Sequence, residues 1–421
     1  MRVLACFLLI LCTAAAQRKP DAAAEQQELS TALAEAGTSP VDFIRALENH
    51  LAKYPASEQR ASIEAALAKS AIEAKDDRRI LLYGERVLAT NPDDIQVLDR
   101  VIRTLLLTED RVAAEKALGL ALRYEHNVEK LAIQNPPGRY SPAQWQEEVL
   151  KGRSRGLMYQ ARATGNMGKQ EDAIELARKC WELYPSAGAA REWARWLSRS
   201  GKNMDAVTHL ADAFTIEDPA STETDRGKDR IRMGELYTKV SGSEKGLGDV
   251  ILQAYDRTQA LMSERVARLK AQDPNTAAAQ ILDFTLPAVK GEPLKLSSLR
   301  GKVVVMDFWA TWCGPCRVQH PLYEKVQQHF KNNPNVVFLA IATDEDRSLV
   351  APILKERNWG AGNNYFESGL ALKLEVSSIP TTIIVDKAGN IASRMNGFVP
   401  ERFVELLINR INQSVAPVVA K

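Results

Sequence analysis

The amino-acid sequence predicts a two-part protein in which an α-helical repeat region precedes an α/β domain. Two patterns indicate this fold class. Between residues 22 and 273, apolar side chains recur at helical spacing without the alternation of a strand. After residue 277, β-branched segments alternate with helical ones, as in an α/β sandwich. The length of 421 residues is sufficient for both parts, because domains average about 150 residues.

The composition excludes several classes of protein. Hydrophobic residues make up 45% of the chain and charged residues 26%, which is typical of a globular protein and not of a collagen-like or wholly disordered one. The chain carries 55 Lys and Arg against 53 Asp and Glu, a formal net charge of +2. Because binding to nucleic acid or to an anionic membrane depends on an excess of positive charge, neither partner is expected.

The first 16 residues have the three features of a secretory signal peptide. Arg2 supplies an early positive charge, residues 3–12 form an apolar run, and residues 14–16 are alanines that precede the polar Gln17. We expect cleavage after Ala16 and an exported mature protein, periplasmic or extracellular. The apolar run is shorter than the roughly 20 residues of a membrane-spanning helix, so no transmembrane segment is expected beyond the signal. An uncleaved anchor is an alternative.

The cysteines indicate redox chemistry. Cys6 and Cys12 lie within the signal, and lipid attachment to Cys12 is disfavoured because a large residue precedes it. The mature chain then keeps Cys180, Cys313 and Cys316, too few for a structural disulfide framework. The last two have the C-x-x-C spacing of a redox pair or of half a zinc site. A zinc site is disfavoured because no second C-x-x-C or nearby histidine pair supplies the missing ligands.

Residues 22–273 contain a repeat of 33 to 34 residues. Gly168-Lys169 recurs at Gly201-Lys202, and Pro185 recurs at Pro219. A turn glycine and a terminal proline at this period resemble the tetratricopeptide repeat, although the pattern is degenerate. The resemblance implies a concave surface that binds partner proteins. A helical spacer or a dimerisation arm is the alternative, and residues 135–138 are expected to break the helices into two bundles.

Residues 277–415 are expected to form the α/β domain. Its predicted elements are a hairpin of 283–286 with 293–296, a strand over 303–308, a helix from 313 to about 330, a strand over 336–342, an antiparallel pair of 382–385 with 391–395, and a closing helix over 400–411.

The residues that carry chemistry are the two cysteines at the start of the predicted helix after the first long strand. An unperturbed thiol, with a pKa of about 8.5, is only about 3% thiolate at pH 7, and only the thiolate attacks a disulfide. A helix N-terminus stabilises the thiolate of Cys313, because backbone N–H groups and the helix dipole face it. Cys316 lies one turn further on and can attack the mixed disulfide. Pro315 suits the first helical turn, where its missing N–H costs nothing.

This segment closely resembles thioredoxin. The resemblance lies in Asp307-Phe308-Trp309-Ala310, Trp312-Cys313-Gly314-Pro315-Cys316, Pro321 and Ile379-Pro380-Thr381, and the leading hairpin is similar to the exported TlpA/ResA branch. It implies that Cys313 and Cys316 form a redox-active disulfide, that no other cofactor is needed, and that Trp312, Gly314, Pro315, Ile379 and Thr381 support the site. It also implies that Pro380 is a cis proline opposite the cysteines, where backbone pairs with an extended substrate.

Asp307 interrupts an otherwise apolar strand. Its carboxyl is therefore expected to be buried with a raised pKa and to exchange a proton with Cys316, the alternative being a purely structural aspartate. Thioredoxin has a lysine near this acid on the neighbouring strand, whereas residues 336–342 contain none. We therefore expect a different proton relay.

Other candidates are weaker. His320 and His329 are expected to be exposed helix residues, and Cys180 a buried core thiol. The peroxiredoxin arrangement is absent, because Met306 and Ala310 occupy the places of its proline and threonine. No phosphate loop, catalytic triad or acidic metal cluster occurs.

The sequence is therefore interpreted as an exported thiol-disulfide oxidoreductase that reduces protein disulfides and is recharged by a thiol electron donor. Its helical repeats are expected to recruit partner proteins. The alternative is a helical adaptor whose thioredoxin-like domain is mainly structural.

Overall fold

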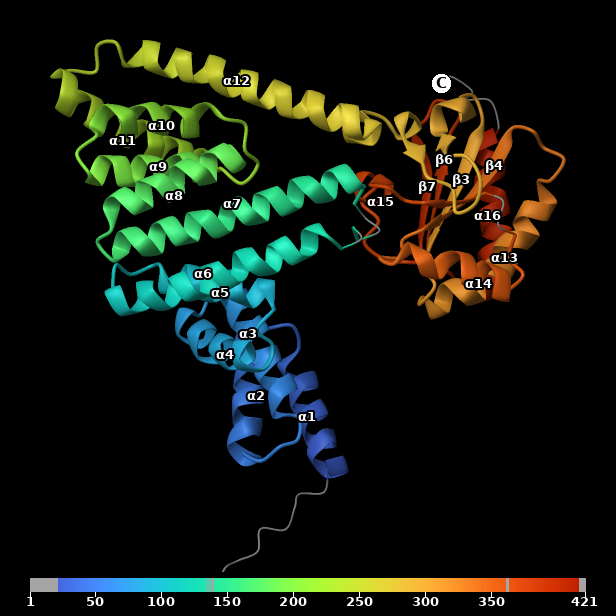
Figure 1. Ribbon diagram of the computed structural model, residues 1–421. Helices are drawn as coiled ribbons and strands as arrows, with labels where there is room; N and C mark the ends of the chain where they lie inside the picture. The colour runs from blue at the N-terminus through green and yellow to red at the C-terminus, as the bar shows by residue number, and fades with distance from the viewer. Residues whose placement is uncertain (1–21, 135, 138–139, 361–362, 416–421) are drawn as a thin grey trace, which may run out of the picture. The chain divides into compact units, whose positions relative to one another are not determined.

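The computed structural model describes residues 22–134, 136–137, 140–360 and 363–415 (Figure 1). It divides into two compact units, one ending at Leu120 and one beginning at Ala121. The expected signal peptide lies outside the described residues, as do two residues of the helix-breaking segment 135–138. No helix in the described part of the chain is both long and apolar enough to cross a membrane.

The first unit is built from helices whose apolar faces form a shared core. Leu47, Leu67, Leu98 and Ile102 are almost completely buried there, which is what the 3.6-residue period of each helix dictates. Aspartate side chains cap two of the helices. The helices are α1 (Ala22–Ala36), α2 (Pro40–Lys53), α3 (Arg60–Ala74), α4 (Asp77–Thr90), α5 (Ile95–Leu105) and the first part of α6 (Arg111–Ala132).

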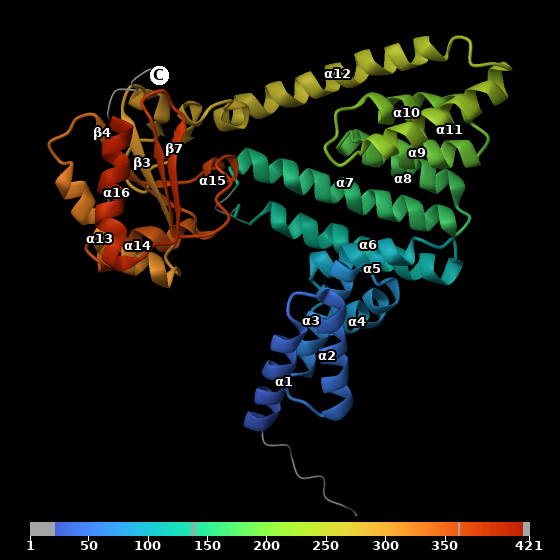
Figure 2. The same ribbon diagram turned by 180° about the vertical axis from the view of Figure 1, so that it is seen from behind.

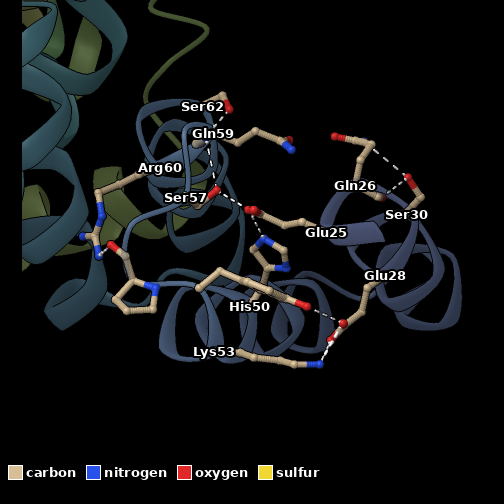
Figure 3. A network of polar contacts seen from close by, with 12 residues as sticks. Glu25, Gln26, Glu28, Ser30, His50, Lys53, Ser57, Gln59, Arg60 and Ser62 are labelled. Atoms are coloured by element: carbon tan, nitrogen blue, oxygen red, sulfur yellow. Dashed lines mark hydrogen bonds and ion pairs between the residues drawn. The ribbon is translucent and has the colours of Figure 1, made fainter. Parts of the chain in front are cut away.

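A polar network joins α1 to α2 and to the segment after it (Figure 3). The buried Glu25 carboxylate contacts His50 Nε2 at 3.2 Å and accepts a hydrogen bond from the Ser57 hydroxyl through the same oxygen. At the exposed edge, Lys53 Nζ donates to Glu28 at 2.6 Å. Ser57 therefore bonds to the carboxylate and not to the imidazole, so this trio lacks the serine–histidine contact that activates a nucleophile. It ties the first two helices together.

In the helical part of the second unit, each of the helices α7 to α11 packs against the next one along the chain, and α12 packs against α10 (Figures 1 and 2). Gly168 and Gly201 both have positive φ, 89° and 79°, at the turns that end α7 and α9. The helical region is confirmed, and the two similar turns are consistent with a helical repeat, while the assignment to the tetratricopeptide family stays a prediction. The helices are the end of α6, α7 (Pro142–Asn166), α8 (Gln170–Leu183), α9 (Ala187–Arg199), α10 (Asn203–Thr215), α11 (Glu223–Ser241) and α12 (Leu247–Gln272).

The α/β domain contains a five-stranded sheet in the order β5-β4-β3-β6-β7. β3 is the central strand; it is parallel to β4 and antiparallel to β6. A two-stranded hairpin precedes the sheet. The strands are β1 (Thr285–Leu286), β2 (Leu294–Lys295), β3 (Val303–Trp309), β4 (Val336–Ala342), β5 (Asn364–Phe366), β6 (Thr381–Val385) and β7 (Ile391–Asn396), and the helices are α13 (Gly314–His329), α14 (Val350–Glu356), α15 (Leu370–Lys373) and α16 (Pro400–Val415).

Both faces of the sheet are covered, as the continuous apolar runs of β3 and β4 require. Val303 and Val305 pack against α13 and α16 on one face, and both views show these two helices on the same side (Figures 1 and 2). Val304 and Met306 face the core formed with the leading hairpin and α15. Because strand residues alternate between faces, Asp307 lies on the α13 side.

The predicted elements of this domain are confirmed to within a few residues. The sequence analysis gave no bounds for any element between β4 and Pro380, where the structure has a 3-10 helix (Arg347–Leu349), α14, β5 and α15. β5 is only three residues long; it pairs with β4 and forms an isolated bridge from Tyr365 to Ala288. So short an edge strand has no recognisable period in the sequence.

Candidate redox site

The cysteine pair lies at the N-terminus of α13. Cys313 is the N-cap residue, and its sulfur accepts a hydrogen bond from the backbone N–H of Cys316 at 3.2 Å. The two residues are joined by a disulfide, with their Cα atoms 5.3 Å apart. Both are nearly buried, whereas the neighbouring Trp312 is 67% exposed. The disulfide is therefore largely shielded from solvent and lies next to an exposed aromatic ring.

Asp307 lies on β3 and is buried beneath α13. Its Oδ1 accepts hydrogen bonds from Gln319 Nε2 at 2.6 Å and from the Thr382 hydroxyl at 3.0 Å. Burial raises the pKa of Asp307 to about 7, although the two hydrogen bonds act in the opposite direction. A carboxyl with this pKa both accepts and releases a proton near neutral pH.

A second buried acid, Asp344, anchors the loop between β3 and α13, and the sequence analysis missed it. Its carboxylate accepts hydrogen bonds from the Thr311 backbone N–H at 3.0 Å and from the Thr311 hydroxyl at 2.5 Å. Burial raises the pKa of Asp344 above its usual value. The signal in the sequence is an acid two residues after the end of β4, but only the parallel pairing of β3 with β4 shows that it faces Thr311.

Pro380 follows a cis peptide bond, as the resemblance implied. Its carbonyl accepts a hydrogen bond from the Gly397 N–H at 2.7 Å, so it is already paired. Ile379 packs against the cluster that contains both cysteines, and Thr381 pairs in register with Phe308 of β3. Gly314 and Pro315 form the first turn of α13. The structure thus places Gly314, Pro315 and Ile379 beside the disulfide, and Thr381 one residue further along the chain from Pro380.

One expectation about the histidines is wrong. His329 is exposed, but the His320 side chain is only 13% exposed and stacks on Trp359, with ring centroids 3.7 Å apart. Burial lowers the pKa of His320 to about 4. Trp359 follows α14, for which the sequence analysis gave no bounds, and for this reason the covering of His320 could not be foreseen.

Cys180 is a buried core thiol, as expected. It is 1% exposed on α8, contacts Ser154, and burial raises its pKa to about 12. It is therefore unreactive at neutral pH. Within the described residues, no group of three His, Cys, Asp or Glu side chains is arranged to hold a metal ion.

The sheet order and the helix-capping disulfide define a thioredoxin-like domain of the thiol-disulfide oxidoreductase class. Residues 276–406 match the family model described as Redoxin. The chain is 32% identical over 121 residues to the thioredoxin-like protein YneN of Bacillus subtilis, covering 26% of this chain and 65% of that protein. It is 28% identical over 134 residues to the thiol-disulfide oxidoreductase ResA of the same organism, covering 31% of this chain and 72% of that protein.

Among solved structures, a secreted disulfide oxidoreductase of Mycobacterium tuberculosis, homologous to DsbE of E. coli, aligns with 25% identity and a TM-score of 0.28. The alignment covers 32% of this chain and 99% of that protein. The Redoxin match lies in the C-terminal part of the chain.

Proposed function

We propose that this chain is an exported thiol-disulfide oxidoreductase that reduces disulfide bonds of protein substrates, and that its helical region recruits those substrates. The observation that carries the proposal is the Cys313–Cys316 disulfide at the first turn of α13, together with the buried Asp307 on the strand that leads to it. The relatives named above support the chemistry, and the pattern of residues 1–16 supports the export.

In the first step, the dithiol form attacks the substrate through Cys313. The N–H of Cys316 and the dipole of α13 stabilise the Cys313 thiolate. A sulfur–sulfur bond forms between Cys313 and one substrate sulfur, and the substrate disulfide breaks. The other substrate sulfur leaves as a thiolate and takes up a proton. The exposed Trp312 would contact the substrate chain, whereas the carbonyl of Pro380 is already paired with the Gly397 N–H.

In the second step, Cys316 resolves the mixed disulfide. Asp307 accepts the proton of the Cys316 thiol, and the resulting thiolate attacks Cys313. The Cys313–Cys316 bond forms, the bond between Cys313 and the substrate breaks, and the second substrate sulfur leaves with a proton. Two electrons have then passed to the substrate. An external dithiol must reduce the Cys313–Cys316 disulfide before the next turnover.

Cysteine variants test this proposal. Cys313→Ser abolishes reduction of a model disulfide such as insulin in the presence of dithiothreitol. Cys316→Ser reacts once and then stalls as a mixed disulfide, because the resolving thiol is missing. Cys180→Ser is the control and leaves turnover unchanged, because that thiol is buried with a pKa of about 12. Turnover retained in Cys313→Ser would contradict the assigned roles.

No reduction by the unaltered protein would favour the alternative, a helical adaptor with a mainly structural thioredoxin-like domain.

A further inference from the structure

Asp307 is held by two donors that share one of its oxygens. Gln319 Nε2 lies 2.6 Å from Oδ1, and Thr382 Oγ1 lies 3.0 Å from the same atom. The two donors also approach each other, at 3.4 Å. Neither of these hydrogen bonds involves Oδ2. A proton on Oδ1 would compete with both donors, so Oδ2 is the oxygen that can carry it.

The position of Gln319 follows from the helix and the sheet. It lies three residues after Cys316 on α13, and residues at this spacing share one face of a helix. Thr382 is the direct partner of Asp307 across the β3–β6 ladder and lies on the same face of the sheet. The amide of Gln319 is 1% exposed, and its Oε1 has no partner among the described residues. Burial of the Gln319 amide with its oxygen unpaired costs free energy. Burial alone therefore does not explain why Gln319 lies against Asp307.

We infer that Gln319 is a positioning residue for the proton-transfer step: with the Thr382 hydroxyl it holds Oδ1 of Asp307 and leaves Oδ2 to exchange the proton with the Cys316 thiol. The inference rests on the proposed disulfide-reducing function. β4 contains no lysine that could perform this role, and its residue opposite Asp307 is Ala340.

Among the described residues, no charged group contributes to the pKa shift of Asp307. Its neighbours across the sheet are Ala340 on β4 and Thr382 on β6. α16 contributes Phe403, Leu407 and Ile411 to this face. α13 contributes the Tyr323 hydroxyl, which donates to backbone carbonyls of β3 and β4 at 3.1 Å and 3.2 Å.

The hydrogen bonds from Gln319 and Thr382 both lower the pKa of Asp307 against the effect of burial. Loss of either donor is therefore expected to raise the proton affinity of the carboxyl.

The direct test is a carboxyl-carbon NMR titration of Asp307 in the disulfide form, which requires no catalysis. Gln319→Met removes the amide at nearly constant volume, and Thr382→Val removes the hydroxyl. Each is expected to move the midpoint of Asp307 to higher pH by about one unit. Gln328→Met makes the same substitution at an exposed position of α13 and is expected to leave the midpoint unchanged. If Gln319→Met does not fold, the midpoint in Thr382→Val still tests the proposal.

The kinetic test follows release of the second substrate sulfur in a single turnover of the dithiol form. The pH midpoint of this step should shift with the NMR midpoint in both variants. In a protein that already carries Asp307→Asn, Gln319→Met should not change the rate of this step further, because Gln319 acts through the Asp307 carboxyl.

Two results would overturn the inference. One is an NMR midpoint that is the same in folded Gln319→Met as in the parent. The other is a rate that falls equally at every pH, which is the sign of a merely structural role. A parent protein that reduces no disulfide would refute the proposed function instead, and the NMR midpoints would still decide whether Gln319 sets the proton affinity of Asp307.

Discussion

At the scale of residues, Asp307 is a buried carboxyl in an otherwise apolar strand. Asp307 lies in a strand whose residues are all buried, and its pKa of about 7 is above the ordinary value of 3.8. The native state therefore favours the protonated carboxyl. Between about pH 4 and pH 7, the folded protein binds more protons at this residue than the unfolded chain does. Folding stability is consequently expected to fall as the pH rises through this window.

Asp307→Asn tests this linkage. The variant lacks the ionisable group, so the free energy of unfolding no longer contains this pH dependence. The free energy of unfolding of the variant, relative to that of the parent, should increase by on the order of 4 kcal/mol between pH 4 and pH 8. The pKa shift of Asp307 is about three units, and each unit corresponds to about 1.4 kcal/mol. Urea unfolding of the disulfide form of residues 273–421 measures it.

Glu401→Gln is the matched control, because it removes an exposed carboxyl on α16 of the same domain. It should not change the pH dependence. A parent and an Asp307→Asn variant with parallel stability profiles would show that Asp307 titrates at its ordinary pKa in the folded protein.

At the scale of elements, close helix packing in the repeat region depends on a glycine. Trp196 of α9 is fully buried, and its ring lies against Gly165 of α7 so closely that a Cβ at residue 165 would overlap the ring carbons. The glycine is therefore required for close approach and not for an unusual backbone angle. Trp196 Nε1 donates to Glu192 at 2.7 Å, so the ring cannot easily move away.

Gly165→Ala is expected to destabilise the helical region by roughly 1 to 3 kcal/mol, the usual cost of forcing extra atoms into a packed core. The decrease would be measured by thermal unfolding followed at 222 nm. Gly227→Ala on α11 is the control, because nothing lies within 4 Å of the added Cβ. That control should be neutral or stabilising, since alanine favours a helix over glycine by about 1 kcal/mol. Equal stability of Gly165→Ala and the parent would contradict the packing described here.

At the scale of the whole molecule, the chemistry and the proposed recruitment belong to different parts of the chain. The α/β domain has its own cores on both faces of the sheet. Its first stabilising contacts begin before β1, where Asn275 accepts from the Thr285 N–H at 2.7 Å and Asp273 accepts from the Asn275 N–H at 2.9 Å. A fragment that retains this segment should therefore start at Asp273.

Residues 273–421 are expected to reduce a small disulfide as fast as the full chain does. With Cys316→Ser as a trap in both forms, the full chain should retain a narrow set of exported proteins as mixed disulfides that the fragment loses. A tethered binding surface raises the effective concentration of a captured partner, up to the millimolar range for short linkers, without altering the redox site. Identical trapped proteins in equal yield would show that the helical region is a spacer or a dimerisation arm.

Export gives a separate expectation for the whole chain. N-terminal sequencing of the mature protein should begin at or near Gln17, because the charge, the apolar run and the three alanines occur in the order of a cleavable signal. An exported form that still begins with Met1 would contradict cleavage.

The sequence by itself determined the helical region, its 33-residue period, the strands β3 and β4 and the position of the cysteines at a helix start. These features depend on local periodicity and turn chemistry, which neighbouring residues encode. The burial of Asp307 was also predictable, because an acid within a β-branched run has no exposed face to occupy.

Only the tertiary structure decided which side chains surround that acid. Gln319 and Thr382 lie 12 and 75 residues away from Asp307 along the chain, and Asp344 lies 33 residues away from Thr311. They meet because helix α13 packs on the sheet and because β4 and β6 both pair with β3. Contacts of this kind depend on register and on packing between elements, and neither quantity is encoded in the local spacing of residues.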